Sequence, residues 1–128
     1  MMATIETVNT EHAPAAVGPY SQAAVYNGIV YTSGQVGLDP SLGRLVADDV
    51  SSQALQVMKN LDAVLKACDS DKSQIIKVNI FLDNMADFPT VNALYAEWLG
   101  EHRPARATVE VAGLPLAAKI EIDVVACQ

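Results

Sequence analysis

The chain has 128 residues, of which 51% are hydrophobic and 18% are charged, and its formal net charge is −7 at pH 7. This length predicts a single domain, residues 1–128, with enough apolar side chains to form a buried core. The eight Lys and Arg residues are scattered along the sequence, which argues against nucleic-acid binding because that requires clustered positive charge.

The clearest local signal near the N-terminus is a β-hairpin in SQAAVYNGIVYTSGQ, Ser21 to Gln35. Two runs of strand-forming residues flank Asn27-Gly28, a pair typical of tight two-residue turns. The next segment, LDPSLGRLV, contains Asp39-Pro40 and Gly43. These residues predict a loop rich in turns.

The middle of the chain predicts a helix followed by a strand. From Asp49 to about Ala67, apolar residues recur at helical spacing, with Asp48 and Asp49 at the start and Lys66 near the end, as the helix dipole favours. A strand follows from Ile75 to Asp83. Its predicted apolar face carries Ile76, Val78, Ile80 and Leu82, opposite Lys77 and Asn79.

The C-terminal third predicts one more helix and two strands. The helix runs from about Asp87, a predicted N-cap, to Leu99, with Pro89 tolerated in its first turn. In HRPARATVEV, His102 to Val111, apolar and polar residues alternate, and they alternate again from Lys119 to Ala126. Both segments are therefore predicted to be strands with one apolar face.

This order of elements predicts an α+β fold in which both helices pack on one side of a single sheet. The other face of the sheet is predicted to be small and polar, and either open to water or in contact with copies of itself in a symmetric oligomer. The low charged fraction also favours an oligomer. The residues assigned to that polar face are Ser33, Lys77, Asn79, Arg106, Thr108 and Glu121.

Cysteine and histidine give no sign of a metal site or a disulfide framework. Cys68 and Cys127 lack metal-ligand spacing, and His12 and His102 stand alone. Reduced thiols, the absence of a targeting pattern and the absence of a membrane-spanning apolar run predict a cytoplasmic protein that does not contact membranes.

Five separated motifs resemble the Rid family of reactive intermediate deaminases, also called the YjgF family. They are APAAVGPYSQA, TSGQVGLDP, NLDAVLKA, FPTVNALYAEW and RPARATVEVAGLP followed by KIEIDVVA, and together they cover nearly the whole chain. The resemblance implies a chorismate-mutase-like fold with a single mixed β-sheet. It also implies a homotrimer with active sites between subunits.

The activity implied by the resemblance is hydrolysis of 2-aminoacrylate, 2-aminocrotonate and related imino acids. The products are 2-keto acids and ammonia, and no metal or organic cofactor is needed. Such an enzyme removes reactive intermediates that pyridoxal-phosphate enzymes release from serine or threonine. The expected partners are therefore the small imino or keto acid and two copies of the chain.

The family's motif arginine corresponds to Arg106, and the resemblance implies that it holds the substrate carboxylate. A planar guanidinium can grip a carboxylate through two parallel hydrogen bonds. Glu121 is the matching carboxylate, which can orient water and move protons. The residues alone leave other readings open, namely a surface arginine or an ion pair of Arg106 with Glu110 or Glu121, and a solvated Glu121.

Four further residues are candidates for substrate binding. Tyr20 can cover a small ligand with its ring, and Ser33 offers a donor and an acceptor; the alternatives are turn packing and a structural strand serine. Asn92 interrupts the apolar stripe of the second helix, where its amide either anchors a loop or contacts the pocket. Thr108 is close to Arg106 in the sequence and on its predicted face, so it is a lining residue at most. The family resemblance differs here, because many members carry cysteine at this position.

Two other classes of function compete with the deaminase. One is a non-catalytic binder of 2-keto acids that uses the same pocket. The other is a ribonuclease or translation inhibitor, against which the acidic composition argues. Within the enzyme class, a dedicated catabolic deaminase acting on a larger substrate such as 2-aminomuconate is also open.

Overall fold

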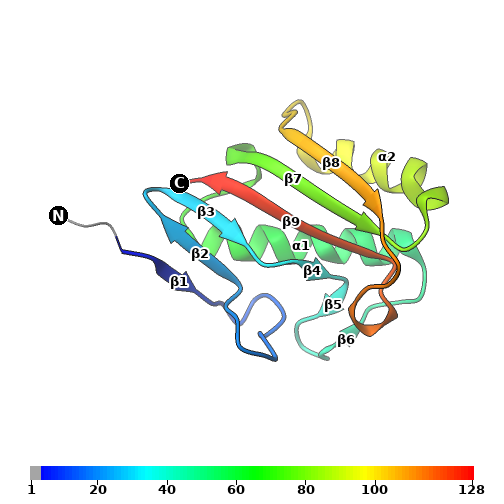
Figure 1. The fold of residues 1–128 in the computed structure, drawn as a ribbon, viewed down its shortest axis with the longest axis horizontal. Coiled ribbons are helices and arrows are strands. Elements are labelled where there is room, and N and C mark those ends of the chain that lie inside the picture. The colour runs from blue at the N-terminus through cyan, green and yellow to red at the C-terminus, as the bar shows by residue number, and fades with distance from the viewer. Residues whose placement is uncertain (1–3) are drawn as a thin grey trace.

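Two helices and a twisted sheet make up the computed structural model, which describes residues 4–128 (Figure 1). None of the helices in this range is long and apolar enough to cross a membrane. Short 3₁₀ turns lie at Lys72–Gln74, Met85–Asp87 and Pro115–Ala117. In chain order the elements are β1 (Glu6–Val8), β2 (Ala23–Tyr26), β3 (Ile29–Thr32), β4 (Gln35–Val36), β5 (Leu38–Asp39), β6 (Arg44–Leu45), α1 (Val50–Ala67), β7 (Ile75–Leu82), α2 (Phe88–Leu99), β8 (Ala105–Glu110) and β9 (Ile120–Cys127).

The main sheet has the strand order β1-β2-β3-β9-β7-β8, with β4 also paired to β9. The β7–β8 pair is parallel and the other pairs are antiparallel. Both helices lie behind the same face of the sheet in Figure 1. The predicted α+β architecture with two helices on one side of the main sheet is therefore confirmed, and β5 and β6 form a separate two-stranded sheet.

The segments with clear local signals in the sequence form the elements that were expected for them. Asn27 and Gly28 have φ of 51° and 75° and close the β2–β3 hairpin with Tyr26 opposite Ile29, as a mirror-image two-residue turn requires. The side chain of Asp49 caps α1 by accepting a 2.8 Å hydrogen bond from the backbone N–H of Ser52. Asp87 precedes α2 but makes no such capping bond.

The core fills the space between the sheet and the helices, and two buried amides tie α1 to the strands. Asn60 donates to the carbonyls of Val36 and Leu38 at 3.3 and 3.0 Å. Gln53 accepts from the backbone N–H of Lys119 at 2.8 Å. These bonds satisfy backbone groups in a buried region, and they hold the β4 segment and the start of β9 in place.

Two predictions about the faces of strands are wrong. The register of β7 against β9 shifts between Ile75 and Lys77, so Ile75 is buried while Ile76 is 46% exposed; an extra residue in a β-bulge reverses the alternation locally. In β8, Arg106 pairs with Val78, a residue of the fully buried, helix-facing row. Arg106 and Thr108 therefore lie on the helix side of the sheet and not on the polar face.

Candidate active site

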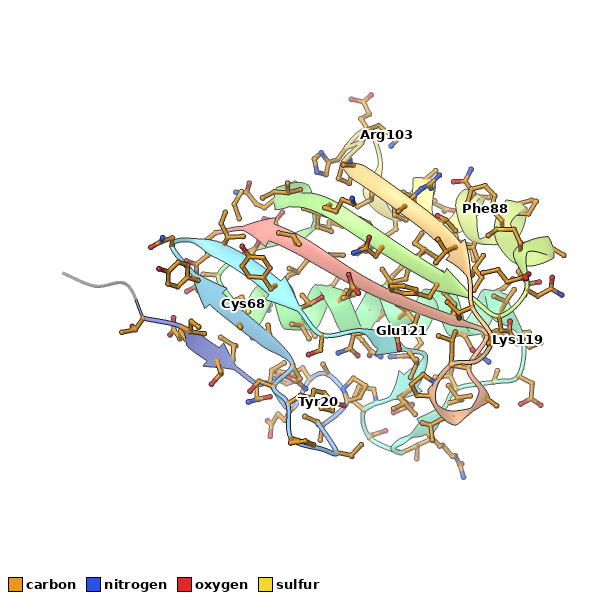
Figure 2. All side chains as sticks on the ribbon, viewed as in Figure 1. Tyr20, Cys68, Phe88, Arg103, Lys119 and Glu121 are labelled. Atoms are coloured by element: carbon orange, nitrogen blue, oxygen red, sulfur yellow. The ribbon has the colours of Figure 1, made fainter. Side chains whose placement is uncertain are left out.

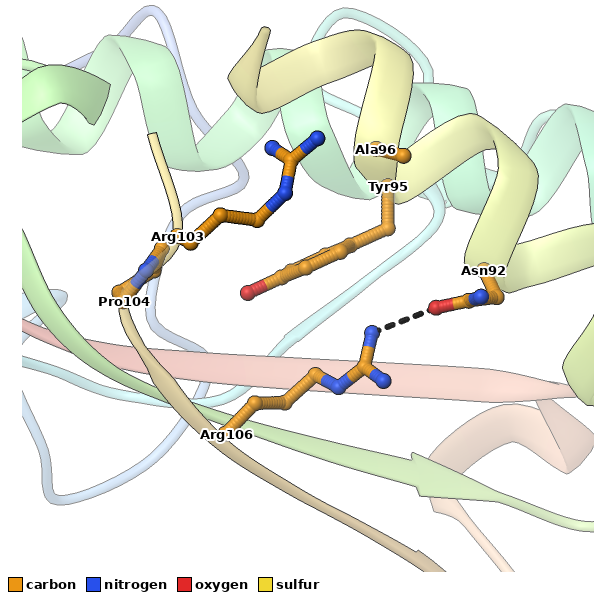
Figure 3. Close-up of a pocket in the computed structure, with 6 residues that line it drawn as sticks. All are labelled: Asn92, Tyr95, Ala96, Arg103, Pro104 and Arg106. Carbon is orange, nitrogen blue, oxygen red and sulfur yellow. Dashed lines mark hydrogen bonds between the residues drawn. The ribbon is translucent and has the colours of Figure 1, made fainter. Parts of the chain in front are cut away.

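A pocket of about 380 Å³ lies between β8 and α2, and we call it the arginine pocket (Figure 3). Its volume falls within the range of small-molecule sites. Because β8 is the last strand of the sheet, the pocket opens at the sheet edge. It is lined by Asn92, Tyr95, Ala96, Arg103, Pro104 and Arg106.

Arg106 is held in the arginine pocket by α2. Its Nη1 donates a 2.6 Å hydrogen bond to Oδ1 of Asn92, and its guanidinium carbon lies 4.9 Å from the ring centre of Tyr95 and 5.3 Å from that of Phe88. Cation–π contacts of this kind orient a guanidinium without using its N–H donors. The remaining donors of Arg106 are thus positioned for a planar anion such as a carboxylate.

The two ion pairs considered for Arg106 are not formed within the chain. Glu110 accepts a 2.7 Å hydrogen bond from the backbone N–H of Met85. Glu121 pairs with Phe81 across β7 and β9, in the row that faces away from the helices. The last two strands of the chain do not pair with each other, because β7 lies between β8 and β9.

Glu121 belongs to a second group of residues, on the open face of the sheet, which we call the carboxylate cluster: Gly34, Asn79, Glu121 and Asp123. Burial raises the pKa of the half-buried Glu121 carboxyl, and the nearby Asp123 charge raises it further. Asp123 itself accepts a 2.8 Å hydrogen bond from the Asn79 amide. A carboxyl whose pKa is raised in this way exchanges protons at a higher pH than an ordinary glutamate does.

Gly34 brings the backbone of the TSGQ segment against the side chain of Glu121. A Cβ added to Gly34 would lie 2.7 Å from both the carboxyl carbon and Oε2 of Glu121. The atoms that would have to move belong to the end of a flexible side chain. The absence of a side chain at position 34 therefore determines where the Glu121 carboxylate can lie.

Replacing Gly34 with alanine is expected to displace the Glu121 carboxylate without unfolding the protein. Since small misplacements of a reacting group have large kinetic effects, we expect kcat for the imine hydrolysis that the family resemblance implies to fall by about 10- to 100-fold. Steady-state kinetics and a thermal melt measure the two effects. Gly113→Ala is the matched control, because nothing lies within 4 Å of its added Cβ; equal kinetics in the two variants would refute the positioning role of Gly34.

Ser33 directly precedes Gly34 of the carboxylate cluster in the chain, and Tyr20 lies on the N-terminal loop. The Ser33 hydroxyl donates to the carbonyl of Ser21 at 2.5 Å, and its N–H donates to the carbonyl of Gln22 at 2.9 Å. Tyr20 is 53% exposed and lines a separate hollow of about 410 Å³ on the N-terminal loop. Figure 2 shows Tyr20 on this loop, apart from Glu121.

A single chain therefore does not bring the predicted site residues together in one place. Arg106 and Asn92 meet in the arginine pocket, whereas Glu121 lies on the opposite face of the sheet. Ser33 directly precedes Gly34, whose backbone lies against Glu121. Thr108 shares the face of Arg106 but does not line the pocket, and its hydroxyl is buried with no hydrogen-bond partner among residues 4–128.

Sequence reasoning did not predict four lining residues of the arginine pocket, of which Tyr95 and Arg103 carry polar groups. Tyr95 follows Asn92 by three residues and so shares its helix face, a spacing that could have placed both in the pocket. Arg103 precedes Arg106 by three residues in the same segment. Within the described part of the chain, no group of three or more His, Cys, Asp or Glu side chains is placed to hold a metal ion.

Comparisons with known proteins give consistent matches over nearly the whole chain. The family model described as endoribonuclease L-PSP matches residues 10–128. Reactive Intermediate Deaminase A, chloroplastic, from Arabidopsis thaliana is 50% identical over 94% of this chain; the chain spans 65% of that protein. The human 2-iminobutanoate/2-iminopropanoate deaminase is 43% identical over 94% of this chain and 88% of its own length.

A solved structure agrees with the fold in detail. YyfA from Yersinia pestis, described as a conserved Rid-family protein of unknown function, superimposes with a TM-score of 0.96 at 44% identity. The match covers 98% of this chain and 100% of that one. The chain therefore belongs to the Rid (YjgF) family, whose matching model carries the description endoribonuclease L-PSP.

Proposed function

We propose that this protein hydrolyses 2-imino acids and their enamine tautomers, such as 2-aminoacrylate and 2-aminocrotonate, to 2-keto acids and ammonia. The observation that carries the proposal is Arg106, a guanidinium oriented by Asn92, Tyr95 and Phe88 in a pocket of small-molecule size. Relatives at 43–50% identity are named as deaminases of reactive intermediates or of 2-iminobutanoate and 2-iminopropanoate, which supports the same chemistry.

In this mechanism Arg106 binds the carboxylate next to the reacting carbon. Two parallel N–H···O bonds fix the plane of the substrate, so that the C=N group has one orientation in the pocket. The enamine first tautomerises to the imine by taking a proton on carbon. Asn92, Ser33 and Tyr20 supply further contacts around the substrate, and Thr108 is the neighbouring hydroxyl on β8.

Glu121 handles water and protons. Its carboxylate accepts a proton from the water that attacks the imine carbon, giving a tetrahedral carbinolamine. This proton passes to the imine nitrogen. The proton of the new hydroxyl group then moves through the same carboxylate to the amino nitrogen, the C–N bond breaks, and ammonia leaves as the carbonyl of the 2-keto acid forms. The raised pKa of Glu121 suits both halves of this transfer, because the same group takes up and releases the proton.

Arg106 and Glu121 lie on opposite faces of one sheet, so a single substrate requires them from two neighbouring copies of the chain. A contact between two different surfaces repeats around a closed ring, and we propose the homotrimer that the family resemblance implies. The face that carries Glu121 also has apolar side chains to bury in such a ring: Tyr31 is 50% exposed and Val109 is 45% exposed.

A trimer has a measurable mass. Sedimentation equilibrium or light scattering at micromolar protein is expected to give about three times the chain mass of 13.6 kDa. A clean monomer under these conditions would leave Arg106 and Glu121 in separate sites, and the two-chain active site would be wrong.

The activity is tested by coupling the protein to a serine dehydratase that releases 2-aminoacrylate. We expect faster appearance of pyruvate and ammonia in its presence than from spontaneous hydrolysis alone. Unchanged rates together with tight binding of pyruvate would identify a non-catalytic keto acid binder. Unchanged rates together with cleavage of an RNA oligonucleotide would instead identify a ribonuclease.

A further inference from the structure

The arginine pocket contains a second guanidinium that the proposed reaction does not use. Arg103 lines the pocket together with Tyr95 and Arg106, and Figure 3 shows the two arginines on either side of the Tyr95 ring. A 2-imino acid with one carboxylate needs only one guanidinium. The guanidinium of Arg103 must therefore either stabilise the fold or bind a further group of the ligand.

The arginine pocket also contains the hydroxyl of Tyr95, which has no hydrogen-bond partner in the described chain. Tyr95 is 5% exposed, and its Oη is buried with no hydrogen-bond partner among residues 4–128. Buried hydroxyl groups are rarely left without a partner. Tyr95 lines the same pocket as both arginines, so the polar groups there other than the Asn92 oxygen, which Arg106 occupies, are mainly donors.

Arg103 has a structural role that uses only one nitrogen of its guanidinium group. Its Nη1 donates to the carbonyl of Gly100 and, at 2.9 Å, to that of His102, next to the C-terminus of α2, where a cation also favours the helix dipole. Both bonds come from the same nitrogen. The Nη2 and Nε donors of the guanidinium are not used by these carbonyls and remain for an anion.

We propose that Arg103 and the Tyr95 hydroxyl form a second anion subsite beside Arg106, which selects 2-imino acids that carry a further carboxylate. This inference rests on the proposed function and specifies its substrate class. The preferred substrates are the imines of dicarboxylic amino acids, in which the carboxylate next to the C=N group binds Arg106 and the distal carboxylate binds Arg103. A pocket of about 380 Å³ accommodates a five-carbon dicarboxylate.

The test compares two stable product analogues, 2-oxoglutarate and 2-oxobutanoate, by isothermal titration calorimetry on the full-length protein. Wild type is expected to bind 2-oxoglutarate more tightly. In Arg103→Gln the ratio of the two affinities is expected to fall by about tenfold, since hydrogen bonds to charged groups are among the stronger ones. Tyr95→Phe, which removes only the hydroxyl, should shift the ratio in the same direction by less.

Arg44→Gln is the matched control, because it removes the same charge from the exposed strand β6 and should leave both affinities unchanged. Equal affinity of wild type for the two keto acids would overturn the subsite. So would an Arg103→Gln protein that melts at a lower temperature and loses affinity for both ligands equally, since that identifies a helix cap only.

Binding of the same two ligands, together with the imine hydrolysis assay, distinguishes failure of the anion subsite from failure of the deaminase function. If wild type hydrolyses no imine but prefers 2-oxoglutarate, and Arg103→Gln abolishes the preference, the subsite holds and the enzymatic function fails. If wild type hydrolyses 2-aminoacrylate and the affinity ratio is the same in wild type and Arg103→Gln, the function holds and the subsite fails.

Discussion

Replacing Arg106 with alanine is expected to lower kcat/KM for imine hydrolysis by about 30-fold or more. The estimate follows from the loss of a charge-assisted bidentate grip, roughly 2–5 kcal/mol at 1.4 kcal/mol per decade. The fold should survive, because Arg106 is exposed in the chain and its removal leaves no buried apolar cavity. Coupled assays with a serine dehydratase measure the activity.

Two further variants sharpen the test of Arg106. Arg106→Lys keeps the charge but not the planar fork, so it should restore only part of the activity. Arg44→Ala removes an exposed arginine from β6 and serves as the charge control. Near-normal hydrolysis by Arg106→Ala would exclude the carboxylate role, and loss of activity only through loss of the trimer would make Arg106 an interface residue.

Replacing Glu121 with glutamine is expected to lower kcat by about 10²–10⁴-fold with little change in KM. The amide keeps the shape of the side chain but cannot take a proton from water. Stopped-flow or steady-state kinetics with freshly generated imine separate the two parameters. A wild-type kcat in this variant would reduce Glu121 to a structural residue.

The wild-type rate is expected to depend on pH through the ionisation of the Glu121 carboxyl. Its carboxyl must be ionised to accept a proton, and burial together with Asp123 raises its pKa. The rate should therefore fall as the pH drops through a value above that of an ordinary glutamate. Asp123→Asn removes the neighbouring charge, so it should move this acid limb to lower pH, and an unmoved limb would assign it to another group.

The raised pKa of Glu121 also affects the stability of the folded chain. A carboxyl whose pKa is raised by folding favours the folded state fully below its unfolded pKa, and this contribution is lost as the pH rises through the folded pKa. At neutral pH the ionised Glu121 is therefore unfavourable within the chain. Glu121→Gln should melt no lower than wild type there, which separates its kinetic defect from unfolding.

Much of the fold follows from short-range patterns in the sequence. The Asn27-Gly28 pair requires positive φ and gives a two-residue hairpin, and the apolar periodicity of residues 50–67 marks the buried stripe of α1. These features depend on neighbours within a few residues. The resemblance to the Rid family rests on the same short motifs, and the match over residues 10–128 confirms it.

The features that depended on distant partners were not predictable in this way. Alternation in HRPARATVEV separates two faces of β8, but it does not say which one meets α2; that depends on the parallel pairing of Arg106 with Val78. The bulge at Ile76 in β7 likewise cannot be predicted from the alternation of apolar and polar residues. Tyr95 joins the pocket only because α2 packs beside the β8 edge.

Subunit mixing measures whether Arg106 and Glu121 of different chains act on one imine. Arg106→Ala and Glu121→Gln proteins, each nearly inactive, are unfolded together in equal amounts, refolded and assayed with 2-aminoacrylate. In a randomly mixed trimer an intact Arg106 faces an intact Glu121 at about one quarter of the sites, so the mixture should recover about a quarter of wild-type activity. A mixture that is no more active than the two variants refolded separately would contradict the two-chain site.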